Sequence, residues 1–314
     1  MSREAGMVIA HIGLLVLLLA LELVLPAYHH GVLARVMVLA SFAMGYNILF
    51  GYTGLLSLGH ALFFAAGMYG MGLAMKHMGW TPAPALLAGL LAGAVCAFGL
   101  ALLALRTTGV AFMIVTLMFA QAGYLTILYF GEWTRGDEGF VIQAAERVLW
   151  GIDLSQPGPR YVAAWVLFSA TFLATLVLVR TPFGKALVAV RENEERVRML
   201  GYNTFALKLW AMGLSGTMAA AAGATYGLLF GYVGASFGSV QYSILPLLWV
   251  LLGGAGTVLG PFIGTLFMFY LIDLSSGITT AYMLIAGVAL VLLTLFAPQG
   301  LAGELRRRIW KDLP

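Results

Sequence analysis

The sequence predicts an all-α membrane protein, a polytopic bundle of about ten transmembrane helices. Of its 314 residues, 61% are hydrophobic and 10% are charged, and the mean hydropathy is +0.95. About a quarter of the residues of a soluble domain are charged. The charged residues also gather between long apolar runs, as they do in membrane-protein loops. An alternative is eight crossings plus two re-entrant segments, because glycine-rich breaks interrupt the pattern twice.

Six apolar stretches, each about as long as a bilayer-spanning helix, come before the charged segment 180–208. They are residues 7–26, 32–50, 57–75, 82–105, 109–130 and 161–179. The first has no small-residue cleavage site after it, so we interpret it as a span and not as a signal peptide.

Residues 51–59 carry three glycines and make a poor continuous helix. This break is either a tight cytoplasmic turn or a broken helix that lines a cavity. Polar residues near it and in the fifth stretch are candidates for the translocation path: Asn47, Ser57, His60, Thr116 and Gln121. Hydrogen bonds between helices are the alternative role for each of them.

Four further stretches follow, at residues 209–230, 242–252, 262–273 and 278–296, with a second glycine-rich break at 253–261. Glycines four residues apart allow two helix backbones to approach closely. This spacing predicts helix packing at Gly89, Gly93, Gly223, Gly227, Gly231, Gly256, Gly260 and Gly264.

The loop charges predict the topology. Residues 131–160 have an acidic excess and are expected outside the cell, with a short helix over 140–150. Ten of the 17 Lys and Arg residues lie in 180–208 and 306–311, which places both segments in the cytoplasm. We therefore expect cytoplasmic termini, a transmembrane permease domain over 1–296 and a basic cytoplasmic tail over 297–314.

Residues 180–208 hold nine of the 30 charged residues, so this segment is expected in water. Leu187, Val190, Val197 and Leu200 fall close to helical spacing on one face. The sequence predicts a short amphipathic helix whose apolar stripe is not covered by its own chain. We interpret it as a docking element for a second protein.

Several chemistries have no motif here. The chain lacks a phosphate-binding G-x-x-x-x-G-K-[ST] loop, metal-ligand spacing among its five histidines, and a nucleophile with an adjacent base. We therefore expect no enzyme activity, no metal and no cofactor on this chain. The clustered basic residues do not indicate nucleic-acid binding. An ion-coupled secondary carrier is an alternative, although no row of membrane-embedded acids supports it.

Four motifs resemble the LivM-type permeases of branched-chain amino acid ABC importers. They are NILFGYTGLLSLGHALFFAAGMYG (47–70), RTPFGKALVAVRENEERVRMLGYNTFALKLWAMGLSG (180–216), GGAGTVLGPFIGT (253–265) and APQGL (297–301). The resemblance implies a bacterial inner-membrane permease subunit that forms a heterodimer with a LivH-type permease. It also implies two cytoplasmic ATPase subunits, which bind ATP and Mg, and a periplasmic substrate-binding protein.

In such importers, segment 180–208 resembles the coupling segment that seats in the ATPase, and Gly201 matches the glycine of its EAA-like motif. The implied coupling residues are Arg191, Glu192, Glu194, Glu195, Arg198 and Gly201. The chain departs from the family at 196–198, where Arg-Val-Arg replaces small residues.

The resemblance implies transport of branched-chain, hydrophobic amino acids, and urea or short-chain amide importers with similar permeases are the alternative. We expect the ATPases to move the 187–200 helix as a rigid lever and thereby open the path alternately to each side. Residues 131–160 would receive the loaded binding protein.

Overall fold

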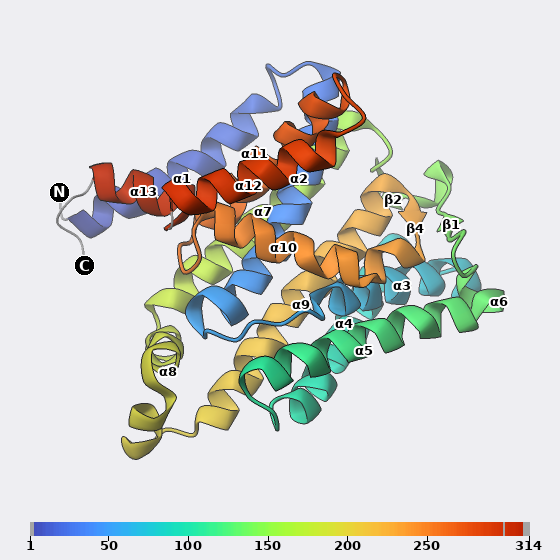
Figure 1. Ribbon diagram of the computed structural model, residues 1–314. Helices are drawn as coiled ribbons and strands as arrows, with labels where there is room; N and C mark the ends of the chain where they lie inside the picture. The colour runs from blue at the N-terminus through green and yellow to red at the C-terminus, as the bar shows by residue number, and fades with distance from the viewer. Residues whose placement is uncertain (1–2, 298, 310–314) are drawn as a thin grey trace.

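The computed structural model describes residues 3–297 and 299–309, and most of them form helices (Figure 1). The ten longest apolar or near-apolar helices are α1 (Arg3–Leu21), α2 (Ala27–Asn47), α3 (His60–Met78), α4 (Pro82–Ala104), α5 (Gly109–Tyr129), α7 (Pro157–Arg180), α9 (Thr204–Phe230), α10 (Val240–Gly253), α11 (Gly260–Ser276) and α12 (Tyr282–Phe296). The all-α prediction is confirmed, and a helix covers most of each predicted stretch. The end of the predicted tail, residues 310–314, lies outside the described residues, as does Pro298 of the last motif.

Five helical segments in the described part of the chain are long and apolar enough to cross a membrane: Tyr28–Tyr52, Pro82–Ala104, Gly109–Tyr129, Pro157–Arg180 and Thr204–Phe230. In contrast, α10 and α11 have 14 and 17 residues. At 1.5 Å per residue, each is shorter than the ~30 Å hydrocarbon core. The choice between ten crossings and eight stays a prediction.

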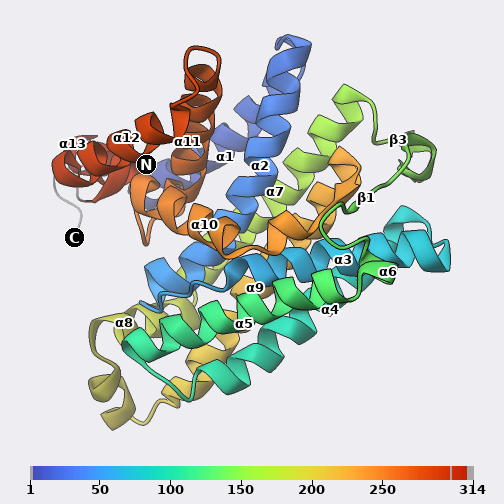
Figure 2. The same cartoon turned by 45° about the vertical axis from the view of Figure 1, so that its right-hand side comes forward.

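The helices form two groups that share α9 (Figure 2). In one group, α3, α4 and α9 pack closely together. In the other, α2 contacts α7, α9, α10 and α11. Every residue of α2 from Val32 to Asn47 is buried except Arg35. An apolar helix that is buried all round is the expected centre of such a bundle.

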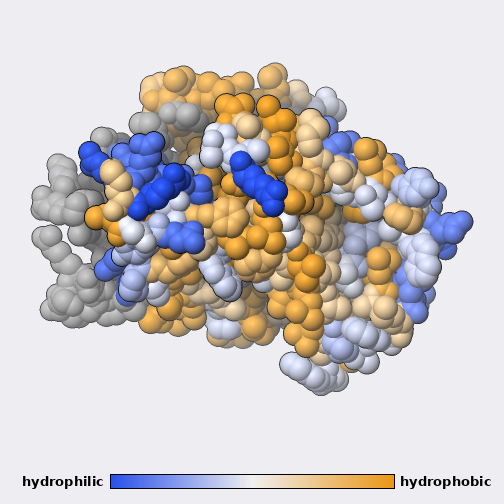
Figure 3. All heavy atoms as spheres, turned by 90° about the horizontal axis from the view of Figure 1, so that it is seen from below, coloured by the Kyte–Doolittle hydropathy of each residue, from blue (hydrophilic) through white to orange (hydrophobic). Residues whose placement is uncertain are grey.

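Figure 3 shows a surface of the kind that a bilayer covers. Apolar residues dominate the middle of this face, and hydrophilic residues gather toward its left and right ends. Many large apolar side chains on the lipid-facing sides of α4 and α5 are exposed, such as Leu87, Val95, Val110 and Met118. In water this surface would be costly, but hydrocarbon solvates it. The chain is therefore a multi-pass membrane protein.

Glycine allows the close packing of α9 on α3. A Cβ atom on Gly223 would lie 1.9 Å from the carbonyl oxygen of Phe64. Similarly, a Cβ on Gly67 of α3 would lie 2.1 Å from the carbonyl oxygen of Ala220. Both obstacles are backbone atoms, so no side-chain rotation can relieve them. The backbones of α3 and α9 therefore touch where Phe64 and Gly67 face Ala220 and Gly223, as small-residue interfaces do in membranes.

We expect Gly223→Ala to lower the free energy of unfolding by about 1–3 kcal/mol, because the added methyl group must push two helices apart. The thermal unfolding midpoint of the detergent-solubilised protein measures this effect. Gly99→Ala is the matched control, since Gly99 is exposed and a Cβ there meets no atom within 4 Å. Equal midpoints for the two variants would contradict the packing argument.

The predicted short helix over 140–150 is wrong. Strand β1 (Phe140–Val141) pairs antiparallel with β4 (Tyr232–Val233), which directly follows α9. A 3₁₀ turn (Ala144–Glu146) and a small hairpin of β2 (Val148–Leu149) and β3 (Ile152–Asp153) complete the loop. A short helix, α6 (Gly131–Thr134), precedes them. The partner strand lies about 90 residues away in sequence, so local periodicity cannot reveal this pairing.

The remaining elements are a π-helical turn (Ile48–Tyr52) that extends α2, a 3₁₀ turn (Ala235–Gly238), the charged helix α8 (Pro182–Met199) and α13 (Gly300–Ile309). In Figure 1, α8 lies at the lower left and β1 at the right, at opposite ends of α9. We call the end near α8 the inner end and the end near β1 the outer end.

Candidate functional site

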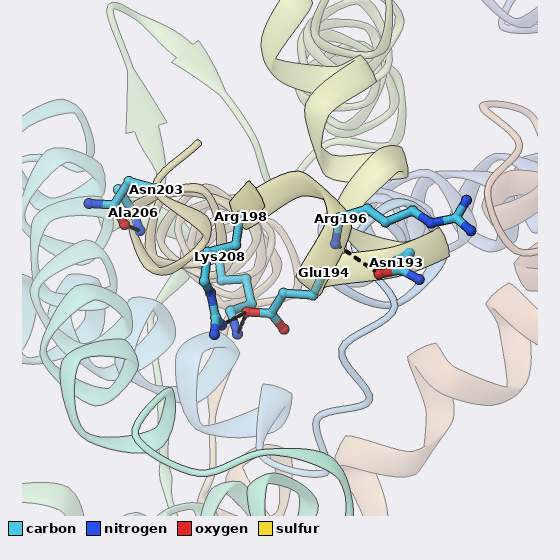
Figure 4. Close-up of polar contacts among 7 residues, drawn as sticks. All are labelled: Asn193, Glu194, Arg196, Arg198, Asn203, Ala206 and Lys208. Carbon is cyan, nitrogen blue, oxygen red and sulfur yellow. Dashed lines mark hydrogen bonds and ion pairs between the residues drawn. The ribbon is translucent and has the colours of Figure 1, made fainter. Parts of the chain in front are cut away.

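Helix α8 is bent and does not form one rigid rod. It begins at Thr181, whose hydroxyl accepts a hydrogen bond from the Gly184 amide, with Pro182 in the first turn. At Asn193 the backbone leaves the helical region, with φ −162° and ψ 98°. The Asn193 side chain then accepts from the Arg196 amide at 2.9 Å and caps a second short helix (Figure 4). The predicted single lever over 187–200 is wrong at this residue.

The chain itself covers the apolar stripe of α8. Leu187, Val190 and Val197 are 0%, 5% and 5% exposed, because α8 packs on α7 and α9. Leu200 is 76% exposed and does not belong to the stripe. The prediction of an uncovered stripe is therefore wrong: α9 starts only a few residues after α8 and returns alongside it.

An ion-pair cluster fastens the second half of α8 to α9 (Figure 4). The Lys208 ammonium, on α9, lies 2.7 Å from the Glu194 carboxylate, and Arg198 lies 3.2 Å from the same oxygen. Partial burial acts to raise the pKa of Glu194, but the hydrogen bond and charge of Lys208 outweigh it, so the pKa lies below its usual range. A carboxyl with a lowered pKa stabilises the folded state at neutral pH, and this contribution disappears as the pH falls through that pKa.

The turn between α8 and α9 exposes apolar side chains at the inner end. Gly201 adopts φ +89°, a conformation that glycine adopts at little cost. Around it Met199, Leu200 and Tyr202 are 79%, 76% and 54% exposed. We call Met199, Leu200 and Tyr202 the apolar tip. Such a patch, rimmed by charged residues, is typical of an interaction surface.

The six predicted coupling residues lie in different surroundings. Glu192, Glu195 and Arg198 are exposed on α8. Glu194 is bound to Lys208, and Gly201 shapes the turn. A charge reversal at Glu194 would therefore break an internal ion pair, whereas a charge reversal at Glu195 would change only an exposed side chain. Arg191 points in another direction, toward the bundle.

Arg191 connects α8 to the first glycine-rich break. Its Nη1 donates to the carbonyl oxygen of Gly51 at 2.6 Å, and its other nitrogens bind Glu192. Gly51 lies in the π-helical turn that ends α2. A Cβ on Gly54, where φ is +77°, would lie 2.7 Å from Arg191 Cγ. The arginine stem thus lies directly against the break.

The two glycine-rich breaks meet at Asn47. Its Oδ1 accepts from the Gly256 amide at 2.9 Å, and its Nδ2 donates to the Thr257 carbonyl at 2.8 Å. A Cβ on Gly51 would lie 2.4 Å from the Gly256 nitrogen. We call Asn47, Gly51, Gly256 and Thr257 the break junction. The Asn47 side chain thus satisfies two backbone groups of the second break, as non-helical backbone away from water requires.

The other path candidates lie close by but differ in exposure. Ser57, His60 and Thr116 are fully buried, whereas Gln121 is half-buried on α5. Thr116 Oγ1 accepts from the Leu58 amide at 3.1 Å. Ser57 Oγ accepts from the Gly59 amide at 3.2 Å. These hydroxyl groups already stabilise the first break.

His60 has one partner and one free nitrogen. Its Nε2 lies 2.7 Å from Ser215 Oγ, and that hydroxyl donates its proton to the Gly45 carbonyl. Nε2 must therefore be the donor. Nδ1 is buried and has no hydrogen-bond partner among the described residues. A proton on Nδ1 would lack an acceptor there, so the imidazole is neutral in this arrangement.

The predicted packing glycines all face nearby atoms. A Cβ on Gly93 would lie 2.0 Å from the Cβ of Ala220, and one on Gly264 would lie 1.9 Å from the Trp249 carbonyl oxygen. Added Cβ atoms would approach neighbours within 3.1 Å at each of Gly89, Gly223, Gly227, Gly231, Gly256 and Gly260. Gly231 and Gly256 also have positive φ angles. At these two positions the backbone conformation is a second reason for glycine, in addition to close packing.

A group of basic residues at the outer end is absent from the sequence-based candidates. Arg35 on α2, Arg160 on α7 and Arg147 gather around Phe230, the last residue of α9. We call the three arginines the arginine cluster. The sequence contains one signal for this cluster, which is Arg35, a single charge inside the apolar stretch 32–50. A charge inside such a stretch indicates a functional site by default.

Within residues 3–297 and 299–309, no group of three His, Cys, Asp or Glu residues could hold a metal ion. The lone Cys96 is a partly buried free thiol.

Comparison with known proteins gives consistent results. The family model described as "Branched-chain amino acid transport system / permease component" matches residues 29–296. The chain is 28% identical to the High-affinity branched-chain amino acid transport system permease protein LivM of Escherichia coli (strain K12), over 92% of this chain and 73% of that protein. The protein of the same name from Salmonella typhimurium is 29% identical, over 84% and 68%.

A similarity over a shorter part of the chain extends to another transport system. The chain is 28% identical to the Autoinducer 2 import system permease protein LsrC of Photorhabdus laumondii, over 61% of this chain and 56% of that protein. No solved structure matches the chain.

Proposed function

This chain belongs to the family of permease components of branched-chain amino acid transport systems, and from that premise we propose that it is the LivM-type half of an ATP-driven importer. It is a membrane-embedded transport subunit, and ATP hydrolysis belongs to partner ATPases. The observation that carries the proposal is the arrangement of α8: the exposed apolar tip follows its C-terminal end, and Arg191, near the middle of the helix, binds the Gly51 carbonyl in the bundle.

The tip would bind an ATPase subunit, and Arg191 would transmit its movement to the break junction. Lys208 and Glu194 hold the second half of α8 against α9, so a push on the tip would move α9 as well. Because the element is bent at Asn193, the two halves would act through different contacts and not as one lever. Movement of α2 and α10 at their breaks would then open the path alternately to each side.

We propose branched-chain amino acids as the solutes. The support is the extent of similarity: the LivM relatives align over 92% and 84% of this chain, whereas LsrC aligns over 61%. Urea and short-chain amides are the alternative solutes. A periplasmic binding protein that docks on the outer loop over 131–160 would then determine most of the solute specificity.

The proposed assembly contains a LivH-type permease as heterodimer partner, two cytoplasmic ATPases and the binding protein. The proposed location is the bacterial inner membrane with both termini in the cytoplasm. The proposed orientation agrees with the basic side chains of α8 at the inner end and the acidic excess of the outer loop.

The test is uptake of radiolabelled leucine into proteoliposomes that contain the whole assembly. We expect leucine uptake to require ATP on the side of the membrane that carries the ATPases. It should also require leucine-loaded binding protein on the opposite side. As controls, ATP is replaced by ADP, and an ion gradient replaces ATP. Uptake by this chain alone along an ion gradient would contradict the proposal and favour a secondary carrier. ATP-driven uptake of urea in place of leucine would correct the solute class.

A further inference from the structure

The arginine cluster brings together residues that are far apart in sequence. The guanidinium carbon of Arg35 lies 5.1 Å from the centroid of the Phe230 ring, and that of Arg160 lies 5.7 Å from it. Arg147 reaches the same end of α9, where its Nη1 donates to the Leu229 carbonyl at 3.1 Å. Three cations therefore meet at the outer ends of α2, α7 and α9.

The three arginine side chains differ in the contacts that they make. Arg147 neutralises the negative end of α9, a structural role, and Gly231 leaves room for it, because a Cβ there would lie 2.9 Å from the Arg147 guanidinium carbon. Arg160 donates one Nη2 hydrogen bond to the Ser155 carbonyl, and the buried Nε atoms of both Arg147 and Arg160 have no partner among the described residues. Arg35 is exposed, and its contact with the Phe230 ring is not accompanied by a hydrogen bond or ion pair in the described part of the chain.

The charge of the cluster is only partly neutralised. Asp153 is the acidic residue whose charge acts on both Arg147 and Arg160. Hydrogen bonds from Ser155 lower the pKa of Asp153, so this carboxylate is ionised at neutral pH. Three positive charges and one negative charge leave a net charge of +2. A surplus of guanidinium donors with this geometry fits an oxyanion such as a carboxylate.

Aromatic side chains continue from the cluster toward the interior. The ring of Tyr226 lies 4.6 Å from that of Phe230 and 5.2 Å from that of Phe237, and Phe237 lies 5.1 Å from Tyr242. All four side chains are half-buried. An apolar surface therefore borders the cationic group on its inner side.

We propose that Arg35 and Arg160 form an entry site that binds the carboxylate of an amino-acid solute, whose branched side chain packs on Phe230 and Tyr226. The inference rests on the proposed function as an amino-acid importer. The two arginines would supply a positive charge for the solute carboxylate, which the neutral polar residues at the first break do not provide. A phosphate of a lipid headgroup offers the same oxyanion chemistry, and the experiment separates the two sources.

The experiment measures equilibrium binding of leucine and leucinamide to the purified transporter without its binding protein, in phosphatidylcholine nanodiscs. Leucinamide keeps the side chain but lacks the carboxylate. We expect leucine to bind about tenfold more tightly than leucinamide, since a charge-assisted pair is worth at least that factor. Arg35→Gln should remove this preference. Arg35→Lys should keep only part of it, because an ammonium cannot form a two-pronged contact.

Arg135→Gln is the matched control. Arg135 is also exposed on the outer loop, and its side chain forms no hydrogen bond or ion pair among the residues that the structure describes. We expect this variant to bind leucine as the unchanged protein does. Equal preference for leucine in Arg35→Gln and Arg135→Gln would overturn the inference.

Three further outcomes are decisive. An effect of Arg35→Gln on uptake that requires phosphatidylglycerol in the vesicles would assign the cluster to a lipid headgroup and overturn the inference. Loss of ATPase stimulation by the binding protein, with leucine preference retained, would assign it to an acidic residue of that protein. Absence of leucine binding by the unchanged transporter would also overturn it, whereas ATP-driven leucine uptake by the same sample would leave the proposed function standing.

Discussion

The ATPase subunits should no longer bind the permease once Leu200 is replaced with Glu, and ATP-driven uptake should stop with them. Leu200 is 76% exposed at the apolar tip, between Met199 and Tyr202. A hot-spot side chain near the centre of an interface contributes about 2 kcal/mol or more, roughly a 30-fold change in affinity, and we expect Leu200 to be such a residue. The glutamate adds the cost of burying an unpaired charge. Co-purification of the subunits from detergent measures the loss.

The change should leave the permease itself folded, because most of the Leu200 side chain is already exposed. Ile152→Glu is the control, since Ile152 is 53% exposed on β3 at the outer end. It introduces the same charge at the opposite end of the molecule from the apolar tip. A Leu200→Glu variant that still purifies with ATPase subunits and transports leucine would refute the docking role of the apolar tip.

Composition alone predicts the helices, because the bilayer leaves few other structures for the long apolar runs of this chain. For this reason the ten predicted stretches coincide with helices even where propensity is poor. Glycine within helices also becomes interpretable, since Gly67 and Gly223 lie where backbones touch. Hydropathy cannot decide whether a 14-residue helix such as α10 crosses the membrane by itself.

The charged segment shows what periodicity misses. Leu187, Val190 and Val197 do share one buried face, but their spacing cannot reveal that α9 covers it. Asn193 carries the local signal for a kink, because its short side chain competes with helical hydrogen bonds. In a sequence this signal is weak. The structure makes it clear, because the Arg196 amide donates a hydrogen bond to Asn193 Oδ1.

Long-range contacts account for the rest. Asn47 is predicted as a residue of the path, yet both ends of its amide bind the second break, more than 200 residues away. Arg35 carries a visible signal, a charge inside an apolar run, but its neighbours Arg147 and Arg160 come from other segments. Only the folded chain brings the three together, so a sequence can identify the residue and not the cluster.

Replacement of Arg191 with Ala should separate ATP hydrolysis from transport. The apolar tip stays intact in this variant, so the ATPases should still bind and hydrolyse ATP. Leucine uptake should fall more than tenfold, because the charge-assisted hydrogen bond to the Gly51 carbonyl at 2.6 Å is lost. The number of ATP molecules hydrolysed per leucine imported, measured in proteoliposomes, should rise accordingly.

Glu192→Gln is the control for Arg191. Glu192 is exposed and contacts Arg191 without touching the break, so its replacement leaves the Gly51 hydrogen bond in place. Normal uptake by Arg191→Ala would show that α8 moves the bundle through α7 and α9 alone. A fall in uptake restricted to Arg191→Ala would locate the transmission at the break junction, where Gly51 and Gly256 lie against each other. One push on that junction acts on both glycine-rich breaks at once, since Asn47 ties α2 to the second break.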